Sequence, residues 1–186
     1  MFTSKDRCYQ GKSPKFHEES FVASGAEIVG DVTVGRFASF WHNVSARGDV
    51  NRIEVGEYSN VQDNAVLHVS DDGPCILGDF VTVGHGAIVH AATVEDHCLI
   101  GMGATVLDHA VIGRGSIVAA GAVVTAGTVV PPNSLVVGVP GKIIPRKEDQ
   151  VPRIHAQAVK YKTLWTLWYG IHPDAEGEVY EGEKIV

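Results

Sequence analysis

Residues 94–117 read VEDHCL-IGMGAT-VLDHAV-IGRGSI, four consecutive steps of six residues. Each step opens with a branched aliphatic residue, and a small residue stands four places further on, as Cys98, Ala104 and Ala110 do. An amphipathic helix has a period of 3.6 residues and a strand a period of two, so neither explains this pattern. Six residues suit one short strand and a turn, and three such units close a triangular coil. The stretch therefore predicts a hexapeptide parallel β-helix with coils stacked about 4.8 Å apart.

The same period extends over most of the chain. An insertion at 47–52 and a loop at 69–76 interrupt it, and one residue is lost after Val89. We expect an all-β, left-handed parallel β-helix domain over residues 1–146, with an irregular segment at 1–21; the left hand is that of other proteins with this repeat, because the period alone does not determine it. The predicted inward positions are Ile28, Val34, Phe40, Ala46, Val55, Val61, Leu67, Leu77, Val83, Val89, Val94, Ile100, Val106, Ile112, Val118, Val124, Val130 and Val136.

Residues 147–186 are predicted to form a C-terminal helix and a tail. Pro140 and Pro145, with neighbouring glycines, end the repeat. A helix is expected to open at 147–150 and to lay an apolar stripe along the outside of the coil. The acidic tail at 170–186 is expected to be loosely held. The stripe consists of Ile154, Ala158, Tyr161, Leu164, Trp165 and Trp168.

Composition narrows the class of protein. A formal charge of −7, with no run of Lys and Arg, argues against a nucleic-acid partner. No apolar run approaches the roughly 20 residues that cross a bilayer, and residues 1–7 lack the apolar core of a secretory signal. Cys8, Cys75 and Cys98 are odd in number and widely spaced, which fits a reducing compartment, and Cys98 stands at a core position. We therefore expect a cytoplasmic protein with no nucleic-acid or membrane partner.

Two histidines are predicted to lie side by side on one face of the coil. Residues 55, 61 and 67 occupy the first, second and third faces of one coil, and residues 77, 83 and 89 occupy them in the next. His68 follows Leu67 and His90 follows Val89, so both project outward from the third face in successive coils. Their backbones should lie about 5 Å apart, which suits two imidazoles binding one ion.

His85 lies two residues after Val83, on the second face, and should point away from a different side of the prism. If three prisms pack around a three-fold axis, the second face of one subunit meets the third face of the next, and a cyclic trimer closes this contact. Three neutral imidazoles around an open position form the ligand set of a hydrolytic or hydrating zinc centre. We therefore predict a homotrimer with zinc sites between subunits, although iron or cobalt also suits histidine ligands.

The other histidines receive no metal role. His97 and His109 lie in other registers and are predicted to be exposed repeat positions, and the remaining histidines have no comparable setting. The alternative for the three candidate ligands is that they only form hydrogen bonds at a surface or an interface.

These residues resemble the γ-class carbonic anhydrases among hexapeptide-repeat proteins, over roughly residues 28–146. The resemblance is carried by Arg47-Gly48-Asp49, Asn60-Val61-Gln62-Asp63-Asn64, Leu67-His68, His85 with His90, and Ile100-Gly101-Met102-Gly103. It implies a lyase that reversibly hydrates carbon dioxide to bicarbonate at a zinc site in a trimer interface. The implied metal ligands are His68 and His90 of one subunit and His85 of the next.

The resemblance also implies roles for residues around the metal. Gln62 looks like the residue that orients the attacking hydroxide toward carbon dioxide. Arg47 and Asp63 look like an interface ion pair that shapes the pocket and helps to hold bicarbonate, with trimer stability alone as the alternative. Asp49 and Asn60 look like supports that fix the orientation of their neighbours.

This chain departs from the archetype of that family after the first histidine. The archetype carries a long acidic loop with a proton-shuttling glutamate, whereas the loop at 69–75 is short and contains no glutamate. Asp71 or Asp72 could replace it or could simply form the turn. Short-loop relatives often place a tyrosine of the C-terminal helix near the metal, so Tyr161 is a candidate catalytic residue, with packing in the stripe as the alternative. Hydration is accordingly expected to be weak, absent or dependent on conditions.

Two further functions stay open. Residues 137–142 look like the exit segment of hexapeptide acyltransferases, which favours an acyl-CoA-using acyltransferase or thioesterase. The absent glutamate favours a non-catalytic trimeric assembly protein that keeps the metal for structure. A shared fold does not decide among these functions.

Overall fold

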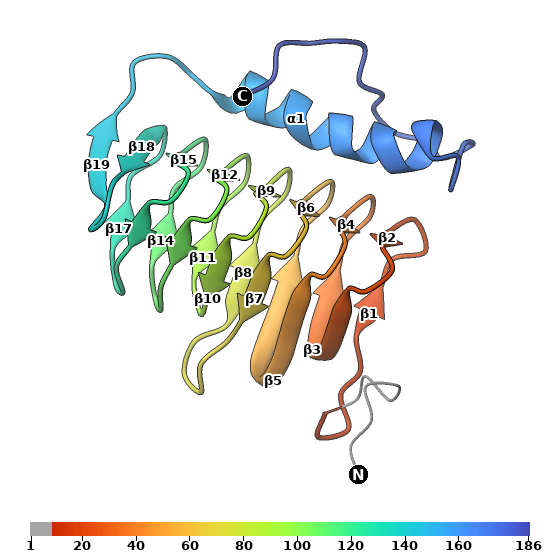
Figure 1. The fold of residues 1–186 in the computed structure, drawn as a ribbon, viewed down its shortest axis with the longest axis horizontal. Helices are drawn as coiled ribbons and strands as arrows, with labels where there is room; N and C mark the ends of the chain where they lie inside the picture. Colours follow the sequence, from red (N-terminus) through yellow and green to blue (C-terminus); the bar gives the residue numbers. More distant parts are fainter. Residues whose placement is uncertain (1–8) are drawn as a thin grey trace.

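The computed structural model of the protein describes residues 9–186, so Cys8 and residues 1–7 lie outside the described part. Short parallel strands stack into a β-helix, and one helix runs back across its coils (Figure 1). The predicted parallel β-helix with a C-terminal helix is confirmed.

Each face of the prism is a ladder of short strands, and two long strands bend from the third face to the first. The first face contains β1 (Lys15–Phe16), β8 (Cys75–Leu77), β11 (Thr93–Val94), β14 (Val111–Ile112) and β17 (Val129–Val130). The second face contains β2 (Phe21–Val22), β4 (Ser39–Phe40), β6 (Asn60–Val61), β9 (Thr82–Val83), β12 (Leu99–Ile100), β15 (Ile117–Val118) and β18 (Ser134–Val137), with β19 (Lys142–Pro145) antiparallel at its end. The third face contains β7 (Val66–His68), β10 (Ile88–His90), β13 (Thr105–Val106) and β16 (Val123–Val124), and the bending strands are β3 (Glu27–Val34) and β5 (Ser45–Val55).

The predicted inward positions form the core. Every one of the residues named for them is at most 3% exposed. Cys98 is also fully buried as predicted, and burial raises the pKa of its thiol to about 12. Because burying one such aliphatic side chain contributes roughly 1.5–3 kcal/mol, the stacked core is the main source of stability of the coil.

The loop at 69–76 does not disturb the assignment of faces. Val55 pairs with Leu77 on the first face, and Leu67 pairs with Val89 on the third. Residues before and after the loop therefore keep the positions that the period predicts.

The first coil begins earlier than expected. Residues 1–21 were expected to be irregular, but Lys15 and Phe16 form β1 and pair with β3. The His17 N–H also donates to the Val34 carbonyl at 3.0 Å. This ladder depends on backbone hydrogen bonds, which a segment without the aliphatic step can still make.

The C-terminal helix α1 (Val151–Thr163) begins after Gln150, later than predicted, and continues as a π-helical turn η1 (Leu164–Trp168). The stripe is fully buried at Ile154, Ala158 and Trp165, whereas Trp168 is 58% exposed. A π-helical turn holds more residues than an α-helical one, so the chain rotates and Trp168 leaves the stripe. Within residues 9–186, no helix combines the length and the apolar character that a membrane span requires.

The tail is attached rather than loose. The Glu178 N–H donates to Tyr58 Oη at 3.0 Å, and the Tyr180 N–H donates to Thr163 Oγ1 at 2.8 Å. Tyr180 and Ala175 also pack against the aromatic side chains between the helix and the coils. The expectation of a loosely held tail is therefore wrong.

Candidate metal centre

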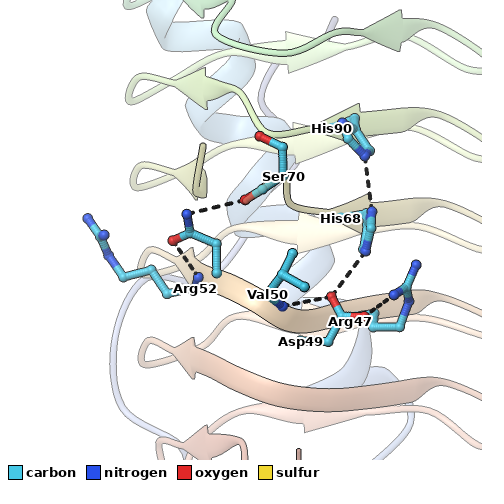
Figure 2. A network of polar contacts seen from close by, with 8 residues as sticks. Arg47, Asp49, Val50, Arg52, His68, Ser70 and His90 are labelled. Atoms are coloured by element: carbon cyan, nitrogen blue, oxygen red, sulfur yellow. Dashed lines mark hydrogen bonds and ion pairs between the residues drawn. The ribbon is translucent and has the colours of Figure 1, made fainter. Parts of the chain in front are cut away.

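Strands β7 and β10 place two imidazoles next to each other on the third face. His68 and His90 are register partners, and His68 Nδ1 lies 3.0 Å from His90 Nε2 (Figure 2). Their ring centroids are 5.0 Å apart and the rings are tilted by 53°. Two nitrogen ligands of a tetrahedral zinc ion lie about 3.3 Å apart, given Zn–N distances of about 2.0–2.1 Å. The pair is thus close to the spacing that a shared metal requires.

A carboxylate stands at the outer end of each imidazole. Asp49 Oδ1 lies 3.2 Å from His68 Nε2, and Asp108 Oδ1 lies 2.6 Å from His90 Nδ1. When each ring donates its N–H to its carboxylate, the two unprotonated nitrogens face each other. Two facing acceptors are stabilised by a proton or a cation between them, so this donor set fits a metal ion.

Asp49 is the centre of a polar network on β5. Its carboxylate accepts the Val50 N–H at 2.9 Å and pairs with the Arg47 guanidinium (Figure 2). Burial alone would raise the pKa of Asp49, but these two partners outweigh it and lower the pKa. Burial, together with the charge of Arg47, lowers the pKa of His68. Both shifts favour a neutral imidazole beside an ionised carboxylate, and neutral histidine is the form that binds metal.

His85 stands apart from this pair. It lies on the turn after β9, next to Gly86, whose φ of +66° permits the tight turn. Its Nδ1 is 3.0 Å from Asp63 Oδ2, and its side chain is 43% exposed. In the described part of one chain, no three His, Cys, Asp or Glu side chains are grouped to hold a metal. One chain therefore offers a histidine pair and a separate third histidine.

Gln62 is held in a single orientation beside a cavity. Its Nε2 donates to Asn60 Oδ1 at 3.1 Å, and Asn60 Nδ2 donates to Thr82 Oγ1 at 2.9 Å. This network fixes the Gln62 amide with its carbonyl Oε1 on the side away from Asn60. The cavity has a volume of about 290 Å³, and Gln62 lines it together with Leu99 and Gln157.

The other predicted residues lie on separate sides of the site. The Tyr161 ring meets Trp41 edge-on, with centroids 5.4 Å apart. Burial raises the pKa of the Tyr161 phenol and the negative charge of Asp63 raises it further, so the helix brings this tyrosine toward the Asp63 side of the prism. Within the chain Arg47 pairs with Asp49 and Asp63 pairs with His85, so an Arg47–Asp63 pair across an interface stays a prediction.

His97 is not the exposed repeat position that its register suggests. Its ring stacks on Phe80 with centroids 4.8 Å apart, and its Nε2 lies 3.1 Å from His155 Nδ1. His155 Nε2 in turn lies 2.7 Å from Glu178 Oε2. Helix α1 and the tail cover this turn, which the six-residue period cannot show. His109 is half exposed, as predicted.

Asp108 is not among the residues predicted for the site, although the sequence places it near His90. Asp108 follows β13, which pairs with β10, and it comes 18 residues after His90. Because one residue is lost after Val89, this coil has 17 residues rather than 18. Extending the register of His68 and His90 by one more coil therefore places Leu107 opposite His90, and Asp108 lies one residue further on, in the turn.

The chain is 55% identical, over 144 residues, to the probable carbonic anhydrase of Methanocaldococcus jannaschii, and the match covers 77% of this chain and 91% of that protein. The chain belongs to the γ-class carbonic anhydrase-like family of hexapeptide-repeat proteins. The carbonic anhydrase of Geobacillus kaustophilus is 47% identical over 136 residues, which cover 73% of this chain and 75% of that protein. The family model for the bacterial transferase hexapeptide (six repeats) matches residues 91–126.

A solved structure of a hexapeptide transferase family protein from Anaplasma phagocytophilum has the same fold. The TM-score is 0.80 at 40% identity, and the match covers 84% of this chain and 93% of that chain. The carbonic anhydrase relatives show that the protein is a carbonic anhydrase-like enzyme of the γ-class family, and they imply a metal cofactor. The transferase relative leaves a transfer reaction as a second candidate.

Proposed function

We propose that the protein is a homotrimeric, zinc-dependent enzyme that interconverts carbon dioxide and bicarbonate. The observation that carries this proposal is the His68–His90 pair, with 3.0 Å between facing nitrogens and a carboxylate at each outer end. His85 of an adjacent subunit would complete the ligand set. Iron or cobalt could occupy the same three-histidine site.

Exposed apolar residues next to the ligands support a trimer. Ile88 lies on β10, two residues before His90, and is 39% exposed. Met102 is 61% exposed and lies one coil beyond His85 at the same corner, where the Gly103 N–H donates to the His85 carbonyl at 2.9 Å. A closed ring of three copies would cover both surfaces while bringing His85 toward the histidine pair of its neighbour.

The residues of this chain would divide the chemistry among them. Zinc, when bound, lowers the pKa of water to around 7, as in carbonic anhydrase, and so supplies hydroxide at neutral pH. The fixed Oε1 of Gln62 would accept the O–H of the attacking hydroxide and aim its lone pair at carbon. The apolar wall of the cavity would admit carbon dioxide and exclude bulk water. The half-exposed Arg47 guanidinium would hold the bicarbonate anion.

Tyr161 would act as a donor rather than a base. Burial and the Asp63 charge raise the pKa of its phenol, so it stays protonated at neutral pH. The Asp72 carboxylate accepts the Ser70 O–H at 3.0 Å within the loop, which supports its role as a turn former.

The deciding experiment measures carbon dioxide hydration by stopped flow on anaerobically purified protein, with its metal content assayed in parallel. We expect about one metal ion per chain and a kcat/KM of roughly 10⁴ M⁻¹s⁻¹ or more. A His172→Ala variant, which changes an exposed histidine of the C-terminal tail, should keep both. Full metal loading without hydration would contradict the proposed reaction.

Acyl transfer or thioester hydrolysis with acyl-CoA is the second candidate. The transferase relative and the apolar cavity lined by Leu99 and Ile117 favour it. Release of free CoA from acyl-CoA, without hydration of carbon dioxide, would support it. Metal loading with neither activity would instead indicate a non-catalytic trimeric metal-binding assembly protein.

We also propose a reducing compartment, the cytoplasm, as the location of the protein. Cys75 and Cys98 are free and buried, and burial raises the pKa of each thiol to about 12. Thiols that stay reduced are typical of cytoplasmic proteins.

A further inference from the structure

Asp108 occupies the coil that follows His90 on the third face. It stands directly after Leu107, beyond the end of β13, and β13 is the register partner of β10. Its Oδ1 lies 2.6 Å from His90 Nδ1, shorter than the 3.2 Å between Asp49 Oδ1 and His68 Nε2. The two carboxylates therefore flank the histidine pair from opposite ends of the stack.

We propose that Asp108 is a positioning residue of the metal centre, which holds the His90 ring in the tautomer and orientation that aim Nε2 at the metal. The proposal rests on the metal site described above and adds a residue to it. Asp108 touches neither metal nor substrate, and it acts through His90 alone.

The physical reason lies in the single proton of a neutral imidazole. An acceptor at Nδ1 keeps the proton there, so Nε2 has a free lone pair. Without that acceptor, the ring can carry its proton on Nε2, and this tautomer cannot bind a metal through Nε2. The hydrogen bond also restricts rotation of the ring, so less conformational entropy is lost when the metal binds.

The turn does not need the Asp108 side chain for its own structure. The backbone carbonyl of Asp108 accepts the Gly127 N–H at 2.8 Å, which links this turn to the next coil. The side chain is 37% exposed, so its replacement leaves no cavity in the core. Its short bond to His90 is thus directed at the metal centre rather than at the fold.

Asp108→Asn and Asp108→Ala test this role in the full-length protein. Zinc affinity is measured by competition with a chromophoric chelator, and the ligand geometry by the visible absorption of the cobalt-loaded protein. We expect zinc to bind about 10–100-fold more weakly in both variants, with Asn closer to wild type, and the cobalt bands to shift.

The control is Asp96→Asn, which removes an aspartate charge at another corner of the coil. Asp96 Oδ1 accepts the Asp79 N–H at 2.9 Å, and the Asn amide oxygen can still accept it. This variant should bind zinc with wild-type affinity and give the wild-type cobalt spectrum. Circular dichroism of the metal-free proteins should give the wild-type spectrum for every variant, as a check that each is folded.

Two results would overturn the proposal, and only the second would also refute the metal site. Wild-type zinc affinity and cobalt spectrum in both Asp108 variants would refute the role of Asp108 and leave the metal site intact. Failure of the wild-type protein to bind zinc or cobalt would refute the metal site and, with it, the role of Asp108.

Discussion

Two histidine pairs in this molecule have nearly the same spacing and opposite surroundings. The nitrogens of His68 and His90 lie 3.0 Å apart on an outer face, and those of His97 and His155 lie 3.1 Å apart under the helix. In the first pair the rings are tilted by 53° and each has a carboxylate at its outer end. In the second pair the rings are nearly parallel at 13°, and only His155 meets a carboxylate, that of Glu178.

The difference shows that the distance between two imidazoles does not by itself define a metal site. The His97 and His155 rings both stack on Phe80, with centroids 4.8 and 4.3 Å away, so the Phe80 ring covers one side of this pair. This second group, His97 with His155 and Glu178, joins the helix, the tail and one corner of the coil, and we term it the tail clasp. We propose that the outer pair, His68 with His90, accepts a cation, whereas the tail clasp holds segments of the chain together.

Loss of one ligand should give the largest difference between the two pairs. Replacing a residue that supports a metal ligand weakens metal binding by roughly 10–100-fold. His90→Ala removes a proposed ligand itself, so we expect zinc to bind more than about 100-fold more weakly to this variant. His97→Asn should leave zinc bound at the wild-type level. Metal analysis after gel filtration measures both, and the trimer should persist in both. Stoichiometric metal in His90→Ala would contradict the assignment of the outer pair.

Gln62 should affect turnover without affecting the metal. Gln62→Ala removes the carbonyl that we propose orients the nucleophile, and loss of orientation of this kind costs roughly 100-fold in rate. Stopped-flow hydration should show that fall in kcat/KM while the metal content stays at the wild-type level. Gln157→Ala changes the other glutamine of the same cavity and serves as the control, with a much smaller effect.

The tail clasp should affect stability without affecting the metal. Glu178→Gln weakens the 2.7 Å contact between Glu178 and His155. Both side chains are partly exposed, His155 at 31% and Glu178 at 53%. Because solvent screens such a pair, we expect a loss of about 0.5–1 kcal/mol in the free energy of unfolding. Urea denaturation measures the loss, and zinc affinity should not change. Weaker zinc binding in this variant would mean that the two histidine pairs are coupled.

The smallest predicted effect is a pH dependence of stability that comes from His97. Burial lowers the pKa of this imidazole, and the positive charges of Arg114 and His155 lower it further. The unfolded chain protonates histidine near pH 6.5, at a higher pH than the folded protein does. Stability from the neutral ring is therefore fully present above about pH 6.5, and it is lost as the pH falls toward and through the lower folded-state pKa.

His97→Asn should reduce this loss, and asparagine suits the φ of +55° at that position. The thermal midpoint of the variant should change less between pH 7 and pH 5 than that of the wild type. His109→Asn is the matched control, since His109 has a φ of +59° but is half exposed. An equal change in both variants would show that burial of His97 is not the cause.

The sequence could predict the coil and the outer pair because both follow from one local rule. The six-residue period assigns each inward residue to a face, and it keeps His68 beside His90 across the loop. The same rule, extended by one coil, reaches Leu107, and Asp108 lies one residue further on. These features need only the register of neighbouring coils.

The tail clasp could not be predicted in this way. His97 and His155 are 58 residues apart in the chain, and their contact depends on how the helix packs on the coil. The π-helical turn that exposes Trp168 and the hydrogen bond between the tail and Tyr58 depend on the same packing. The six-residue period describes contacts between neighbouring coils, so it does not predict the contacts that the helix and the tail make with the coil.

A subunit-mixing experiment tests the central claim, that neighbouring subunits share each metal site, most directly. His85→Ala subunits keep the His68–His90 pair, and His90→Ala subunits keep His85, so each variant alone lacks a complete site. A mixed trimer formed by co-expression contains one interface at which an intact pair meets an intact His85. We predict about one zinc ion per mixed trimer, with hydration activity restored at that site. Mixed trimers with no more zinc or activity than either variant alone would contradict the shared site.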